Sequence, residues 1–191
     1  MIPELSENDM KMFYRYLDNS TIYFEYGSGG STYQASLRQN IKKIYTVESD
    51  KTWIEQLKNL IKDDSKITYI FNEMGTKPNT WGYPSKSCNE SNLISYSQCI
   101  FNLNLEEIKK IDLIMIDGRF RVACCLKFFN IINDNCYIIF DDFIIRKKYH
   151  IILNYYDIVE KTEDKRMVVL RKKMNVSIPP ELIKKYELIP D

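Results

Sequence analysis

Apolar positions along the chain form two alternating patterns, short continuous runs and longer stretches at helical spacing. The short runs predict strands at residues 22–24, 43–48, 66–71, 111–117, 136–140, 157–161 and 166–171. Helical spacing marks residues 3–18, 32–39, 51–61, 96–109, 121–133 and 147–156, and a short helix is expected in the tail. Strands that alternate with helices predict an α/β protein with a mainly parallel sheet. The last two strands are expected to form a hairpin across Glu163 and Asp164.

Length and composition are those of an ordinary globular protein. The 191 residues predict one domain, with an N-terminal helix (1–19), a core (20–172) and a C-terminal tail (173–191). The chain is 45% hydrophobic and 28% charged, and its net charge of +1 gives no basic excess. We therefore expect no nucleic-acid partner.

Cysteine usage and the absence of targeting signals point to a cytoplasmic protein. The five cysteines are an odd number without zinc-type spacing, so we expect reduced, mostly buried thiols. The first residues lack the apolar core of a signal peptide, and no apolar run has the length of a membrane span. No membrane partner is expected. A homodimer is left open, through apolar residues of the first helix or the tail.

The most informative stretch is TIYFEYGSGGS at residues 21–31. It reads as a short strand that ends in Glu25, a glycine-rich turn, and a helix for which Ser31 is the expected N-cap. A strand, a glycine turn and a helix N-terminus together form a nucleotide cradle. An acid before the turn suits a ligand that carries an amine, whereas a dinucleotide fingerprint needs no acid there. The alternative is that these glycines only turn the chain. The expected cofactor contacts from this stretch are Glu25, Gly27, Ser28, Gly29 and Ser31.

Polar residues follow the predicted strands at the ends where ligands bind in such sheets. They are Glu25, Glu48, Asn72, Asp117, Asp141 and Asp142. Glu48, followed by Ser49, comes about 20 residues after the glycine turn, where an acid accepts hydrogen bonds from a ribose diol. The alternative is a solvated surface acid. This spacing alone does not distinguish a site for a nicotinamide cofactor from a site for S-adenosyl-L-methionine.

Asp117, Asp141 and Asp142 would place three carboxylates on one rim. Carboxylates held so near to one another repel unless a cation neutralises them, and Mg²⁺ is the first candidate for that cation. The alternative is pairing with nearby arginines. Those arginines, Arg119, Arg121 and Arg146, are also candidates for binding the substrate.

Two residues are candidate bases for removing a hydroxyl proton. Asp117 lies at the reaction centre of the predicted rim, where it is also an expected cofactor contact, and its alternative role is to cap the next helix. His150 is the chain's single histidine and titrates in a useful range, although a lone histidine is more often structural. Trp81 and Tyr83, in a long loop after the third strand, are expected to cover the adenine or the acceptor. The alternative is a surface loop held by its own aromatic residues.

These residues resemble the class I S-adenosylmethionine-dependent methyltransferases over about residues 20–172. The resemblance implies a Rossmann-like three-layer sandwich whose seven-stranded sheet has a last antiparallel strand, here 166–171. It also implies that Glu25 holds the methionine amine, that Gly27 and Gly29 lie near the cofactor, and that Glu48 holds the ribose. A closer resemblance, carried by EYGSGGST, VESD, WGYP, DGRFR and DDF with a following YH, is to small methyltransferase-like proteins. Asp117, Asp141 and Asp142 are also similar to the metal site of macrocin-type, Mg²⁺-dependent sugar O-methyltransferases.

Together these features predict a methyltransferase that uses S-adenosyl-L-methionine, with Mg²⁺, to methylate a hydroxyl of a small molecule such as a sugar or nucleotide-sugar. Two alternatives remain. The first is a dinucleotide-dependent oxidoreductase, but this sequence lacks the third glycine of the dinucleotide fingerprint. A catalytically silent binding module would have no use for clustered carboxylates.

Overall fold

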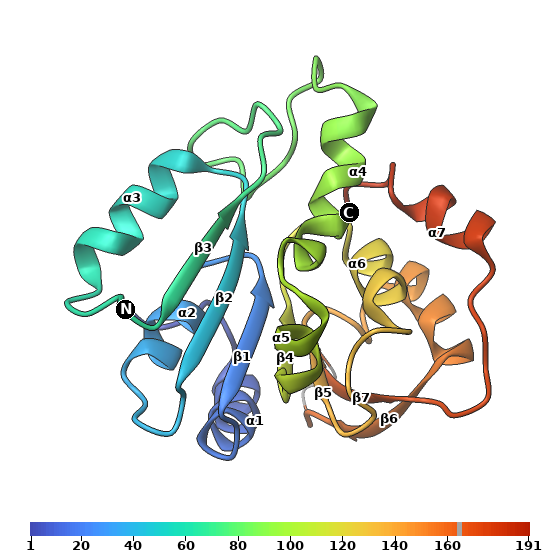
Figure 1. Cartoon of the computed structure of the whole chain (residues 1–191), viewed down its shortest axis with the longest axis horizontal. Helices are drawn as coiled ribbons and strands as arrows, with labels where there is room; N and C mark the ends of the chain where they lie inside the picture. The colour runs from blue at the N-terminus through green and yellow to red at the C-terminus, as the bar shows by residue number, and fades with distance from the viewer. Residues whose placement is uncertain (164–165) are drawn as a thin grey trace.

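The computed structural model describes residues 1–163 and 166–191. Its strands are β1 (Ile22–Tyr26), β2 (Lys43–Glu48), β3 (Ile67–Phe71), β4 (Leu113–Ile116), β5 (Tyr137–Phe140), β6 (Tyr156–Lys161) and β7 (Val168–Lys172). Its helices are α1 (Glu7–Asp18), α2 (Gly30–Ser36), α3 (Lys51–Leu60), α4 (Glu90–Gln98), α5 (Leu105–Lys110), α6 (Arg121–Phe128) and α7 (Pro180–Tyr186). Two 3₁₀ helices, η1 (Cys99–Asn102) and η2 (Lys147–Asn154), complete the elements of the described chain (Figure 1).

The described strands form one seven-stranded sheet in the order β3-β2-β1-β4-β5-β7-β6. Strands β1 to β5 are parallel, and β7 pairs antiparallel with both β5 and β6. The predicted fold class, including the last antiparallel strand, is confirmed. The hairpin expected across Glu163 and Asp164 joins β6 to β7, but Asp164 lies outside the described residues.

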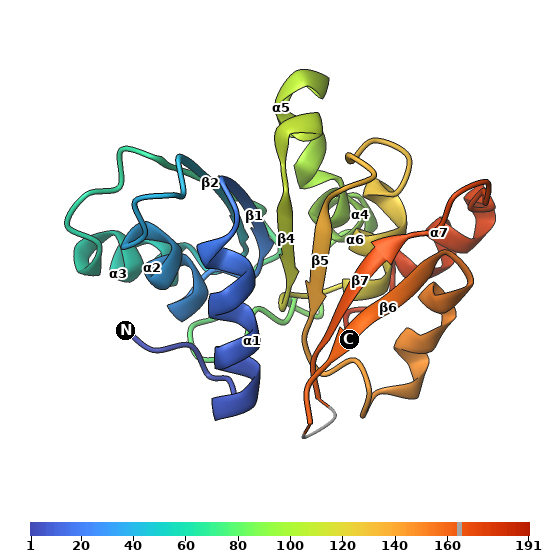
Figure 2. The same ribbon diagram turned by 90° about the horizontal axis from the view of Figure 1, so that it is seen from below.

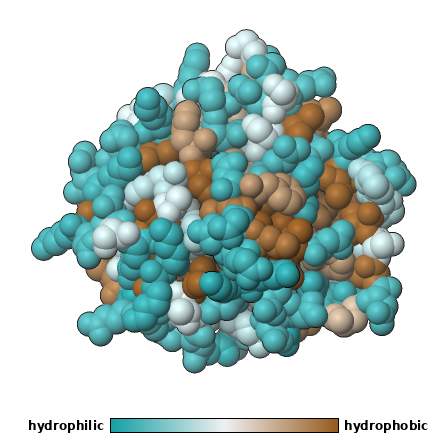
Figure 3. All heavy atoms as spheres, in the orientation of Figure 1, coloured by the Kyte–Doolittle hydropathy of each residue, from teal (hydrophilic) through white to brown (hydrophobic). Residues whose placement is uncertain are grey.

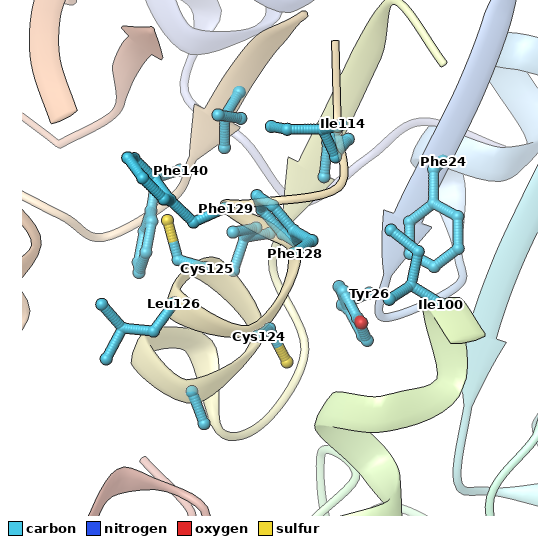
Figure 4. Packing of buried hydrophobic residues seen from close by; sticks show 14 of the residues in the cluster. Phe24, Tyr26, Ile100, Ile114, Cys124, Cys125, Leu126, Phe128, Phe129 and Phe140 are labelled. Atoms are coloured by element: carbon cyan, nitrogen blue, oxygen red, sulfur yellow. The ribbon is translucent and has the colours of Figure 1, made fainter. Parts of the chain in front are cut away.

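Helices cover both faces of the sheet, which makes the three layers of the predicted sandwich (Figure 2). One apolar cluster joins the sheet to α1, α2 and α3 through residues such as Phe13 and Leu57. The other joins it to α4, α5, α6 and η2, and Figure 4 shows Cys125 and Phe128 of α6 in the same packed cluster as Phe140 of β5. Alternate residues of each central strand enter the two clusters, as expected for a sheet buried on both faces.

Three predicted helices in the second half of the chain differ from the structure. Residues 96–109 are not one helix, because Asn104 caps a new helix, α5, and forms a reciprocal capping box with Glu107. The helix expected at 121–133 ends at Phe128, and 147–156 contains the 3₁₀ helix η2. Strand positions were predicted more closely, because short apolar runs are bounded sharply by polar residues.

The surface seen in Figure 3 is mostly hydrophilic, with several apolar patches. Helix α1 buries Met12, Phe13 and Leu17 against the sheet, whereas the tail exposes Met174 and Leu188. The homodimer considered from the sequence therefore stays a prediction, with the tail as its remaining candidate surface.

Candidate functional site

A cavity of about 830 Å³ opens at the carboxyl ends of β1, β2, β4 and β5. This is where the strand order reverses between β1 and β4, the usual ligand position in such sheets. All the site residues expected from the sequence line the cavity except Glu25, Ser49, Asn72 and His150. The cavity wall also contains Trp53, Arg166 and the N-terminal segment 1–4, which sequence reasoning missed.

Two glycines of the turn are required for different reasons. Gly27 has φ +94°, and a Cβ there would lie 2.8 Å from the backbone nitrogen of Gly118. It therefore lets the turn after β1 contact the loop after β4. Gly30 faces the N-terminal segment, because a Cβ there would lie 2.5 Å from Cα of Pro3.

Helix α2 does not begin as predicted. Its N-cap is Gly29, and Ser31 lies within the first turn. The Ser31 hydroxyl donates to Oε2 of Glu25 at 2.6 Å, and the Thr32 hydroxyl donates to Oε1 of the same carboxylate. The Ser31 hydroxyl therefore holds the helix against β1 rather than capping it, whereas Thr32 Oγ1 also accepts from the backbone N–H of the N-cap residue Gly29 at 2.9 Å.

Glu25 is enclosed by protein and does not line the cavity. Its side chain is fully buried, and it accepts a third hydrogen bond from the Tyr23 hydroxyl at 2.9 Å. Burial raises the pKa of Glu25 to about 7, although these hydroxyls oppose the rise. Glu25 therefore anchors the first turn of α2 to β1, and its expected contact with a ligand amine stays a prediction.

The Glu25→Gln substitution should weaken the dependence of stability on pH. The buried carboxyl keeps its proton up to about pH 7, whereas the pKa of an unperturbed glutamate is 4.5. A raised native pKa favours the folded state at low pH, and that advantage, roughly 3 kcal/mol, is lost as the pH rises from 4.5 to 7. Urea unfolding at pH 5 and pH 8 should show a smaller fall in the free energy of unfolding for the variant. Equal falls in both proteins would contradict this assignment.

Glu48, at the end of β2, holds the glycine turn and the start of α3 together. Its Oε1 accepts from the backbone N–H groups of Ser49, at 2.6 Å, and Asp50, at 2.9 Å. Its Oε2 accepts from the backbone N–H of Ser28 at 3.2 Å. Burial raises the pKa of Glu48, while these hydrogen bonds oppose the rise.

Two serine hydroxyls complete the environment of Glu48. Ser28 Oγ donates to Oε2 at 3.1 Å, and Ser49 Oγ donates to Oε1 at 3.4 Å. One hydroxyl thus meets each carboxylate oxygen, the arrangement that the two hydroxyls of a ribose would need. A diol could replace these hydroxyls without changing the chemistry that surrounds Glu48.

Residues 79–83, here called the covering loop, pass over this part of the cavity. Ser49 Oγ also lies 3.3 Å from the carbonyl oxygen of Gly82, so its single proton is shared between this carbonyl and Glu48 Oε1. The Tyr83 ring lies 4.4 Å from the Arg119 guanidinium carbon, a cation–π distance. Trp81 has φ +55° and is 72% exposed, so a bulky residue is held in the left-handed region with its ring at the surface.

The three aspartates are neutralised by arginines. Arg121, whose side chain is 3% exposed, approaches Asp117 Oδ1 at 2.9 Å and Asp141 Oδ2 at 3.5 Å. Arg146 pairs with Asp142 at 2.6 Å, and Arg166 pairs with both Asp141 at 3.2 Å and Asp142 at 2.9 Å. We call these six residues the carboxylate–arginine cluster.

This cluster does not fit a divalent cation. Asp141 is 1% exposed and its oxygens face Arg121 and Arg166, so they are not directed at a shared open position. Within residues 1–163 and 166–191, no group of three or more acidic, histidine or cysteine side chains is arranged to hold a metal. The predicted Mg²⁺ site at Asp117, Asp141 and Asp142 is thus replaced by the arginine pairing considered as its alternative. Arg166 was missed because it lies 24 residues beyond Asp142 in the sequence.

The cluster also changes the expected role of Arg121. Its Nε donates to the Gly118 carbonyl at 3.0 Å and its Nη1 to the Asp141 carbonyl at 2.8 Å. These contacts and its ion pairs direct the guanidinium at protein oxygens, so Arg121 organises the cavity wall rather than binding substrate. Arg146, with a side chain 34% exposed, keeps its predicted place at the cavity surface.

The two candidate bases are separated by the structure. Asp117 lines the cavity with a side chain 36% exposed, next to the glycine turn. His150 lies outside the cavity wall, where its Nε2 is 3.1 Å from the Phe143 carbonyl oxygen and its ring packs on that of Phe143. Nearness to Asp142 in sequence was misleading, because η2 carries His150 away from the rim. Asp117 remains as the candidate base.

Comparison with family models and with curated proteins gives no match to this chain. Solved structures do match. A methyltransferase-like protein from Silicibacter pomeroyi covers 99% of both chains, with a TM-score of 0.84 and 22% identity. An RNA methyltransferase from Salinibacter ruber, in complex with S-adenosyl-L-homocysteine, covers 94% of this chain and 97% of its own, with a TM-score of 0.55 and 12% identity. The M1A22 tRNA methyltransferase of B. subtilis covers 89% and 67%, with a TM-score of 0.52 and 14% identity. At these identities the matches establish a shared fold.

No helix among the described residues is both long enough and apolar enough to cross a membrane.

Proposed function

We propose that this protein is a methyltransferase that uses S-adenosyl-L-methionine and acts on a hydroxyl of a small molecule, such as a sugar or nucleotide-sugar. The observation that carries the cofactor assignment is Glu48, whose two oxygens each receive a serine hydroxyl beside the glycine turn. The fold shared with methyltransferases, one of them crystallised with S-adenosyl-L-homocysteine, supports the same choice.

Different residues of the cavity would contact different parts of the expected cofactor and acceptor. Glu48 and the covering loop would hold the ribose and adenine, and the glycine turn would lie beside the methionine part. The carboxylate–arginine cluster would face the acceptor. Because its three acids and three arginines balance in charge, it favours a neutral acceptor with several hydroxyls over a polyanion.

We assign to Asp117 the role of accepting the proton of the acceptor hydroxyl. When bound, the cofactor supplies a methyl group on a sulfonium for in-line attack by an acceptor oxygen, so the protein must mainly position the acceptor and receive its proton. Asp117 is the cluster's most exposed carboxylate, and Arg121 fixes its orientation at 2.9 Å. Because Arg121, Arg146 and Arg166 already neutralise the cluster, we assign no step to Mg²⁺.

The Asp117→Asn variant should keep the cofactor affinity and lose turnover by about 100-fold or more. Removing the carboxylate removes the proton acceptor while the side chain keeps nearly the same volume. Calorimetry with S-adenosyl-L-homocysteine and a methyl-transfer assay with the identified acceptor would separate the two effects. Unchanged turnover would assign the proton to another group.

Isothermal titration calorimetry with S-adenosyl-L-homocysteine and with NADH tests the cofactor assignment. The adenosyl ligand should bind and NADH should not. Binding of NADH alone would favour the oxidoreductase alternative, and binding of neither would favour a silent module. Methyl transfer would then be compared between sugars, nucleotide-sugars and RNA, since two of the structural neighbours are RNA methyltransferases. Transfer to RNA alone would contradict the small-molecule assignment.

A further inference from the structure

The segment after α7 returns to the cavity and ends its described course at Asp191 (Figure 1). Asp191 is 4% exposed although it lies beyond the last helix. Its Oδ1 accepts from the backbone N–H of Arg121 at 3.0 Å, and its carbonyl oxygen accepts from Arg119 Nη1 at 2.5 Å. Asp191 therefore joins the tail to the loop between β4 and α6.

Helix α6 depends on this contact for its N-terminal cap. Its own N-cap residue is Phe120, which has φ +52° and no side-chain acceptor for the first-turn N–H groups. Such groups need a partner when buried, and a carboxylate at a helix N-terminus also interacts favourably with the helix dipole. Asp191 supplies that carboxylate from 70 residues away in the sequence.

Arg119 connects the same contact to the covering loop. Its side chain is buried, with a relative exposure of 7% for the residue, and among the described residues its Nε has no hydrogen-bond partner. The guanidinium position thus depends on the Asp191 carbonyl on one side and the Tyr83 ring on the other. Gly82, next to Tyr83, lies over Glu48, because a Cβ there would be 4.0 Å from Glu48 Oε1.

We propose that Asp191 is a positioning residue for the cofactor cavity: it fixes Arg119, and Arg119 holds the covering loop closed over Glu48. The inference rests on the proposed function, since it assigns this part of the cavity to the adenosine of the cofactor. It gives the tail a role in ligand binding rather than in stability alone.

The Asp191→Ala variant should bind S-adenosyl-L-homocysteine about tenfold more weakly, because losing the side-chain cap releases the tail, and with it the backbone carbonyl that anchors Arg119. Chymotryptic cleavage after Trp81, in the covering loop, should become faster. Asp191→Asn keeps an oxygen that can accept from the Arg121 N–H and should restore both properties to near wild-type values. Wild-type affinity in Asp191→Ala would overturn the proposal.

Glu187→Gln is the matched control that tests whether loosening the tail anywhere would weaken binding of the ligand. Glu187 is as buried as Asp191, but it pairs with Lys127 at 2.5 Å, away from the cavity. This variant should lower the melting temperature and leave the affinity for S-adenosyl-L-homocysteine unchanged. An equal loss of affinity in Glu187→Gln and Asp191→Ala would overturn a specific role for Asp191.

A second variant covers the case in which Asp191→Ala does not fold. Tyr83→Ala removes the other support of Arg119 and leaves the tail intact, so it should raise cleavage after Trp81 and weaken binding of the adenosyl ligand. Unchanged binding and cleavage in Tyr83→Ala would overturn the proposal. Failure of the wild-type protein to bind the ligand would instead overturn the proposed function itself, which keeps the two failures distinct.

Discussion

The Glu48→Ala variant is expected to bind S-adenosyl-L-homocysteine at least about 100-fold more weakly than the wild-type protein. A ribose diol would make two hydrogen bonds to a charged acceptor, each stronger than a bond between neutral groups. Loss of the carboxylate would also disorder the turn, because the backbone N–H groups and hydroxyls of Ser28 and Ser49 all donate hydrogen bonds to it. Calorimetry measures the affinity directly.

Glu55→Ala is the matched control for Glu48→Ala. Glu55 lies on α3, the helix that follows Glu48, but it is exposed and pairs only with Lys58 among the described residues, at 3.4 Å. Its loss should leave the affinity within about twofold of the wild-type value, since exposed ion pairs contribute little. Comparable affinities of the wild-type and Glu48→Ala proteins, with both shown to be folded by circular dichroism, would remove Glu48 from the binding site.

The part of the site that could be predicted from sequence is the part fixed by backbone topology. Glu48 and Asp117 lie at the carboxyl ends of parallel strands. These ends meet at one edge of the sheet, and this does not depend on what the side chains contact. Their places on the cavity wall therefore follow from strand assignment alone. The covering loop was predicted for a related reason, because loops at that edge lie over the site.

The direction of a side chain was harder to predict, as Glu25 shows. Tyr23 and Glu25 are two residues apart on β1, so they point to the same face, and Tyr23 packs in the cluster beneath α1 and α2. That alternation was a usable signal that Glu25 is buried under α2 and not open to the cavity.

Contacts between distant segments could not be predicted. Three acids near one edge are equally compatible with a metal ion and with arginines, and the deciding residue, Arg166, comes from the start of the last strand. Asp191 similarly reaches α6 from the end of the described chain. Neither residue belongs to a motif, so only the packed structure places it at the cavity.

The second large effect is expected for Gly27→Ala, which should lower the free energy of unfolding by about 3–5 kcal/mol. Gly27 has φ +94°, where an L-residue is strained. A Cβ would also lie 2.8 Å from the nitrogen, 2.9 Å from the Cα of Gly118 and 3.0 Å from the carbonyl carbon of Asp117, all of them backbone atoms. None of these three contacts can be relieved by rotating a side chain, so the loops after β1 and β4 must separate.

Gly29→Ala provides the comparison within the same turn. A Cβ at Gly29 would have its nearest neighbour at 3.9 Å, on the Trp53 ring, and the residue has an extended φ of 168°. Its loss should cost less than about 1 kcal/mol, as expected for a substitution that creates neither strain nor overlap. Thermal unfolding should place Gly27→Ala roughly 10 °C below the wild-type protein and Gly29→Ala close to it. Equal melting temperatures for the two variants would mean that the β1 and β4 loops are not in contact as described. The separation of these loops would also move the glycine turn relative to Glu48, which accepts from the Ser28 N–H, so the affinity of Gly27→Ala for the adenosyl ligand should fall together with its stability.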